Sequence, residues 1–89
     1  MSRRNKIDIV FDLLKAISDK GGTIKPTHLL YKSNLSHKRM KIYLDELMGK
    51  GLIEQKAEKG KMMYSLTDEG YKFIQNYKQL KNFTEAFGL

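Results

Sequence analysis

Residues 26–49 read PTHLLYKSNLSHKRMKIYLDELMG, and the pattern of this segment indicates the class of fold. Proline is well tolerated in a first helical turn, so we expect a short helix from Pro26 or Thr27 to Tyr31. The residues that follow break the helical pattern. Ser36 is a good N-cap for the next helix, which has about twelve to fourteen residues and apolar side chains at steps of three and four. Two helices joined by so short a turn match a helix-turn-helix.

The segment before this pair predicts another helix, from Asn5 to Asp19. Its apolar side chains recur at steps of three and four and share one face: Ile7, Val10, Phe11, Leu14 and Ile17. Ile9 and Leu13 widen this stripe, so we expect the helix to be covered on two sides. Glycines follow its end, and Thr23-Ile24 fits a short extended segment.

The segment after the pair predicts a β-hairpin. Beyond Gly51 the periodicity falls toward two, and strands are expected at residues 52–57 and 61–66, on either side of a glycine-containing turn at 58–60. Three apolar side chains should share one face of this hairpin: Met62, Tyr64 and Leu66. The fold class that follows is α+β and mainly α, with a three-helix core, a two- or three-stranded wing and a C-terminal helix.

Thr67 can cap this last helix, which should reach at least Lys81. We expect residues 1–89 to form one domain, in which the helix at 67–87 carries an aromatic stripe. That stripe is a candidate dimerisation surface, made by Phe73, Tyr77, Leu80, Phe83 and Phe87. The alternative is that the stripe docks a different protein and that the domain is a protein–protein interaction module.

Composition narrows the class of partner. The chain has 89 residues, no cysteine, and 17 Lys and Arg against 10 Asp and Glu, which gives a net charge of +7. Between Lys20 and Lys41 there are six basic residues and no acidic one, a pattern typical of a surface that meets a polyanion. Surplus surface lysines that only maintain solubility are the alternative. The apolar runs are too short to span a bilayer, and no secretory signal is evident.

Four strings of the sequence resemble an archaeal winged helix-turn-helix family that includes the small "ten-a" type chromatin-associated proteins. They are YKSNLS (31–36), YLDEL (43–47), KGLIE (50–54) and YSLTDEG (64–70). The similarity runs from about Lys6 to the end of the chain. It implies a DNA-binding fold that is commonly dimeric through its last helix, although the C-terminal helix expected here is rather short.

The helix after Ser36 is the natural reader of the major groove. Its candidate DNA contacts are Ser36, His37, Lys38, Arg39, Lys41 and Ile42, joined by Lys32 and by the wing residues Lys56, Lys59 and Lys61. A solvated helix face and an inert wing are the alternatives. For Ile42 alone, partial burial or a subunit contact is an equal alternative. Arg3, Arg4 and Lys6 resemble a basic arm, or else a frayed terminus.

No catalytic or metal-binding set is evident. His28 and His37 read as lone surface histidines, while Asp8 and Asp12 read as the polar side of a helix. We therefore expect a non-enzymatic, cofactor-free DNA-binding protein, a transcription regulator or chromatin-associated factor. It should be a homodimer in the cytoplasm, associated with the nucleoid, and no small-molecule substrate is evident.

Overall fold

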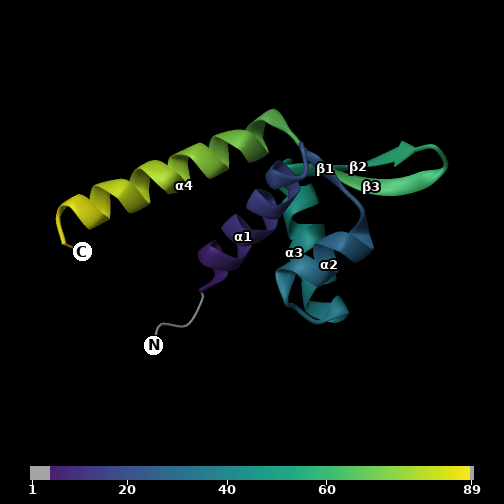
Figure 1. Cartoon of the computed structure of the whole chain (residues 1–89), viewed down its shortest axis with the longest axis horizontal. Coiled ribbons are helices and arrows are strands. Elements are labelled where there is room, and N and C mark those ends of the chain that lie inside the picture. Colours follow the sequence, from purple (N-terminus) through teal and green to yellow (C-terminus); the bar gives the residue numbers. More distant parts are fainter. Residues whose placement is uncertain (1–4, 89) are drawn as a thin grey trace.

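The computed structural model describes residues 5–88, which form four helices and a three-stranded antiparallel sheet (Figure 1). The elements are α1 (Lys6–Asp19), β1 (Thr23–Ile24), α2 (Pro26–Ser33), α3 (His37–Gly49), β2 (Ile53–Glu58), β3 (Lys61–Leu66) and α4 (Asp68–Ala86). This is the predicted order, and the mainly α, α+β winged fold class is confirmed. Within residues 5–88, no helix is both long and apolar enough to cross a membrane.

Side chains cap the helices where the sequence predicts that they begin. The Asn5 side chain accepts a hydrogen bond from the Asp8 N–H at 2.9 Å, and the Asn5 N–H donates to the Asp8 carboxylate at 3.4 Å. This capping box opens α1. At the start of α3, the Ser36 hydroxyl accepts a hydrogen bond from the Arg39 N–H at 3.1 Å, which confirms Ser36 as the N-cap.

The turn between α2 and α3 comes two residues later than predicted, because α2 continues beyond Tyr31. The Ser33 hydroxyl donates to the Leu30 carbonyl at 3.0 Å and accepts from the Leu35 N–H at 3.2 Å, so it supports the helix end from both sides. Asn34 then adopts the left-handed conformation, with φ 58° and ψ 27°. This conformation ends the helix.

β3 is the central strand of the sheet and pairs with β1 on one side and β2 on the other. In the hairpin, Glu58 pairs with Lys61, so the turn consists of Lys59 and Gly60 alone and is one residue shorter than predicted. Both turn residues have positive φ, 51° and 76°, as a two-residue type I′ turn requires.

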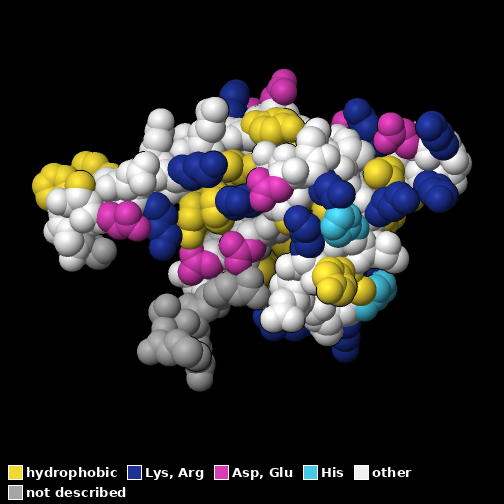
Figure 2. Space-filling view, viewed as in Figure 1, with side chains coloured by type: hydrophobic (Ala, Val, Ile, Leu, Met, Phe, Trp, Pro, Cys, Tyr) yellow, Lys and Arg dark blue, Asp and Glu magenta, His cyan; other side chains and the backbone are white. Residues whose placement is uncertain are grey.

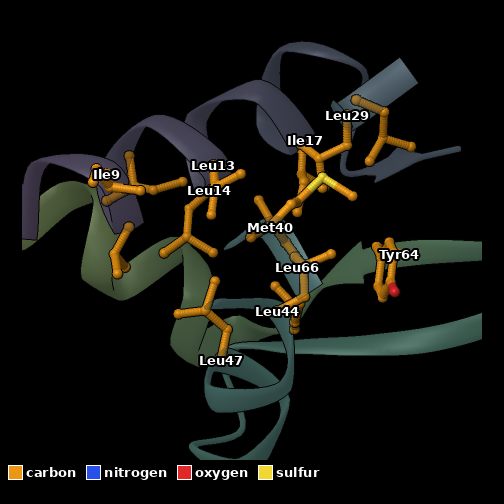
Figure 3. Close-up of a cluster of buried hydrophobic side chains, with 14 residues drawn as sticks. Ile9, Leu13, Leu14, Ile17, Leu29, Met40, Leu44, Leu47, Tyr64 and Leu66 are labelled. Atoms are coloured by element: carbon orange, nitrogen blue, oxygen red, sulfur yellow. The ribbon is translucent and has the colours of Figure 1, made fainter. Parts of the chain in front are cut away.

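The core is one cluster of side chains to which every element contributes. Figure 3 shows Leu14 of α1, Met40 and Leu44 of α3 and Leu66 of β3 converging at its centre. α1 packs against α4 as well as against α2 and β3, which confirms that it is covered on two sides. The buried side of α3 positions its opposite side toward solvent.

Two apolar side chains expected to join this packing lie at its edge. Met62 is on the same strand as Tyr64 and Leu66, which are buried, but it is 41% exposed. It sits next to the hairpin tip, where the wing projects beyond the helices (Figure 1). Ile7 is 49% exposed, because it lies in the first turn of α1 and faces a groove beside α4.

A corner of the chain fixes α4 to the rest of the domain. The Thr67 hydroxyl accepts a hydrogen bond from the Gly70 N–H at 3.1 Å and donates to the Gly51 carbonyl at 2.6 Å. The Leu52 carbonyl accepts from the Thr67 N–H at 3.2 Å. From this corner α4 continues for 19 residues, past the predicted minimum of Lys81, and its C-terminal half extends away from the body of the protein (Figure 1).

Candidate nucleic-acid interface

α3 presents its basic side to solvent. Met40, Leu44 and Leu47 are buried, and the side chains on the opposite surface are exposed: Lys38, Arg39, Lys41 and Ile42. Ile42 is 59% exposed, so its own chain does not bury it. This is the geometry that a helix needs in order to enter a groove of a double helix.

The first turn of α3 adds two polar side chains to this surface. Ser36 and His37 are both exposed, although the Ser36 hydroxyl already caps the helix. Lys41 lies 3.7 Å from the Asp45 carboxylate one turn along, and both side chains are exposed. An exposed pair of this kind contributes little, so Lys41 is readily available to another anion. Within residues 5–88, neither Lys38 nor Arg39 forms an ion pair.

The wing carries its three predicted basic residues on the exposed surface of the hairpin: Lys56, Lys59 and Lys61. Lys59 occupies the turn itself, and Glu58 stands directly before it. Lys32 has a different setting. It lines a hollow on α1 together with Asp12 and Asp19, and is therefore set beside acidic side chains.

The predicted basic arm lies partly outside the described residues, which exclude Arg3 and Arg4. Lys6 is not part of a free arm. It opens α1, and its ammonium group lies 2.7 Å from the Glu46 carboxylate of α3. The hydrogen bond from Lys6 holds the pKa of Glu46 below its ordinary value. The expectation for Lys6 is therefore wrong, because tertiary packing brings the start of α1 against α3.

Sequence reasoning missed a second basic site, between the end of α1, β1 and the start of α2. Lys20, Lys25 and His28 line a hollow of about 300 Å³ there. Figure 2 shows Lys and Arg side chains gathered around a histidine where the helices meet the hairpin. The acid-free stretch is the available signal, since it includes all three residues, but it predicts only a basic surface and does not group Lys20 and Lys25 around His28.

A known family has this arrangement of a helix-turn-helix followed by a hairpin. The profile of the winged helix-turn-helix family matches residues 3–85. The chain belongs to the winged helix-turn-helix family. It is 30% identical over 78 residues to an uncharacterised protein of Methanocaldococcus jannaschii, a match that covers 88% of this chain and 34% of that protein. The chain thus spans about a third of the length of the curated relative that it matches.

Solved winged-helix structures superpose well on the chain. Sso10a-2, a DNA-binding protein from Sulfolobus solfataricus, matches with a TM-score of 0.78 and 21% identity, over 94% of this chain and 85% of that chain. The oxidised form of MarR from E. coli matches with a TM-score of 0.75 and 23% identity, over 82% and 53%. The transcriptional regulator BldR from Sulfolobus solfataricus gives 0.74 and 18%, over 89% and 58%. The predicted likeness to archaeal winged-helix proteins is confirmed for the fold.

The winged helix presents a second surface on α4. Among the five side chains predicted to mediate dimerisation, Leu80, Phe83 and Phe87 are 62%, 60% and 68% exposed. The rings of Phe83 and Phe87 lie 4.8 Å apart. Phe73 is half-buried and packs against the core, and it lines an apolar groove with Ile7 and Leu80.

Tyr77 faces α1. Its ring stacks on that of Phe11 with centroids 4.2 Å apart, and its hydroxyl donates a hydrogen bond to the Asp8 carboxylate. This hydrogen bond, burial and the negative charge of Asp8 raise the pKa of Tyr77 to about 12. Asp8, which was expected on the polar side of its helix, therefore contacts α4. Tyr77 links α4 to α1 within the chain.

Neither histidine belongs to a metal-ligand cluster. Within residues 5–88, no three His, Cys, Asp or Glu side chains lie where they could hold a metal ion together. His28 is half-buried at the start of α2, and His37 is exposed at the start of α3. The exposed basic side chains of α3 and the wing are suited to binding negatively charged groups.

Proposed function

We propose that this chain is a DNA-binding protein, a transcription regulator or chromatin-associated factor, that acts without a cofactor and without catalysis. In this proposal α3 enters the major groove and the wing contacts the phosphate backbone. The observation that carries the proposal is the exposed basic side of α3, with Lys38, Arg39 and Lys41 turned away from the core. The likeness to a DNA-binding protein and to transcriptional regulators of the same fold supports it.

Charge and shape assign different roles to the two elements. Bidentate donors at the start of α3, such as Arg39, suit guanine edges, and the exposed Ile42 suits a thymine methyl group. The wing lysines would contact phosphates, which fix orientation and affinity without reading sequence. A net charge of +7 would add electrostatic steering toward the polyanion.

We further propose that the active form is a homodimer in the cytoplasm, associated with the nucleoid. The apolar side of α4 supports self-association, because Leu80, Phe83 and Phe87 together expose a surface that a second copy could cover. A two-fold arrangement would place two α3 helices about 34 Å apart, one turn of DNA, and would double the number of phosphate contacts.

The same apolar surface favours a second candidate, a protein–protein interaction module in which the winged fold serves as a scaffold. Here α4 would bind a different protein, and α3 would not bind DNA. A monomer with no affinity for duplex DNA is expected in that case. A dimer that binds duplex is expected in the first.

The test is a duplex titration between 50 and 200 mM salt, monitored by fluorescence anisotropy. If about six phosphates are neutralised, affinity falls about a thousandfold over this range. The variant Lys38→Ala/Arg39→Ala/Lys41→Ala should bind every duplex more weakly, and the log–log salt slope should flatten by up to about 2.7 if all three contact phosphates.

A matched variant separates specific contacts from net charge. Lys72→Ala/Lys78→Ala/Lys81→Ala removes the same charge from exposed positions on α4, outside the candidate DNA contacts. This variant should keep most of the wild-type affinity for duplex DNA and most of the log–log salt slope. Equal losses in both variants, or binding that salt does not weaken, would reject α3 as the reading helix. Chain mass measured on the same samples decides between dimer and monomer.

A further inference from the structure

Basic side chains line the hollow at the start of α2. Lys20 directly follows α1, Lys25 occupies the N-cap position of α2, and His28 lies in the first turn of that helix. Thr23, Ile24 and Met63 complete the lining, so the hollow lies beside the paired strands β1 and β3. No acidic side chain is among the described residues that line it.

The surroundings of His28 disfavour a positive charge on its imidazole. Burial comes first among the causes that hold the pKa of His28 below 6.5, followed by the charges of Lys20, Lys32 and Lys25. The nearest acid along α1, Asp19, is paired with Lys15 at 3.0 Å. At neutral pH the imidazole is therefore uncharged, among three ammonium groups.

This hollow continues onto the wing. Lys25 and Met63 also line an adjoining hollow with three residues around the hairpin turn: Glu58, Lys59 and Lys61. The side chain of Lys25 makes no capping hydrogen bond to the start of α2, whose first N–H groups have no partner within the helix. Helix dipole and lysine charge then act on the same space, and both favour an anion.

We propose that this hollow binds a backbone phosphate of duplex DNA and that His28 takes up a proton when the phosphate enters. The inference rests on the proposed function and extends it, because it makes DNA affinity depend on pH. The phosphate neutralises the lysine charges that disfavour the imidazolium, and it offers the new N–H donor an acceptor. The complex then holds up to one more proton per chain than the free protein, so binding strengthens as pH falls.

The chain suits a direct test, because His28 and His37 are its only histidines. The affinity for a duplex of about 20 base pairs would be measured from pH 8 to pH 5.5 at fixed ionic strength, while NMR follows both imidazoles in the free and bound protein. A rise of about one unit in the pKa of His28 on binding predicts an affinity gain of about five- to tenfold per chain.

The two histidine variants are matched controls for each other. His28→Gln should lose the gain between pH 8 and pH 5.5 whatever its affinity at pH 8, because glutamine cannot take up the proton. His37→Gln should keep the gain even if its affinity is lower throughout. Thermal unfolding of each variant checks that the fold is retained.

Several results would overturn the inference. Duplex binding that does not vary with pH, a gain that survives His28→Gln, or a gain that disappears only in His37→Gln would each leave the DNA-binding proposal standing and reject the role of His28. A shift of the His28 resonance in inorganic phosphate but none with duplex would also reject it, since the hollow would then hold only a free ion. No duplex binding at any pH would reject both proposals.

Discussion

Replacing Gly70 with alanine would perturb the corner at which α4 leaves the sheet. A Cβ atom at this position would overlap the Leu52 carbonyl oxygen and lie 2.9 Å from a methyl carbon of Leu66. The Leu52 carbonyl accepts a hydrogen bond from the Thr67 N–H at 3.2 Å, so it cannot withdraw without losing that bond. Backbone therefore has to move to make room.

The expected cost follows from two opposing effects. Overpacking a tight site costs about 1–3 kcal/mol. Alanine inside a helix is better than glycine by about 1 kcal/mol, which offsets part of this cost. Because the main obstacle is a hydrogen-bonded carbonyl, the upper end applies, and Gly70→Ala should lower the free energy of unfolding by about 2 kcal/mol. In a domain of this size the Tm should fall by roughly 8–16 °C.

Urea unfolding followed by circular dichroism, at one fixed protein concentration, measures this loss. Gly49→Ala is the matched control, because Gly49 is the last residue of α3 and an added Cβ there has no described atom within 4 Å. The control should be unchanged or more stable by up to about 1 kcal/mol. If Gly70→Ala were as stable as the control, the close approach of Leu52 would not be what requires glycine in α4.

Two further predictions concern α4. Tyr77→Phe keeps the ring on Phe11 but removes the hydrogen bond to Asp8, and should lower the free energy of unfolding by about 1–3 kcal/mol at pH 8. Since folding raises the pKa of Tyr77 from 10.0 to about 12, this contribution is complete below pH 10 and is lost as pH rises toward 12; urea unfolding at pH 9 and pH 11 should show a smaller loss in the variant than in the wild type. Phe83→Glu/Phe87→Glu places charge on the apolar side and should shift sedimentation from dimer to monomer without changing the helix content; an undiminished dimer would exclude this surface from self-association.

Much of the fold was predictable because its signals are local. A helix start depends on a capping side chain within a few residues, which is why Ser36 and Thr67 mark the starts of α3 and α4 correctly. The wing follows from alternation and a glycine turn in the same way. The predicted end of α2 is two residues too early. The apolar pattern changes after Tyr31, but the helix ends only where Asn34 adopts the left-handed conformation.

For the surfaces of the protein, too, local patterns predict some features and tertiary packing decides the others. The apolar side and the basic side of α3 are evident from the sequence, since helical periodicity sets which residues share a face. Tertiary structure alone decided that Lys6 pairs with Glu46, that Tyr77 turns toward α1, and that Lys20 and Lys25 surround His28. Periodicity cannot specify which element covers a face, because that depends on how helices and strands distant in sequence pack around one shared core.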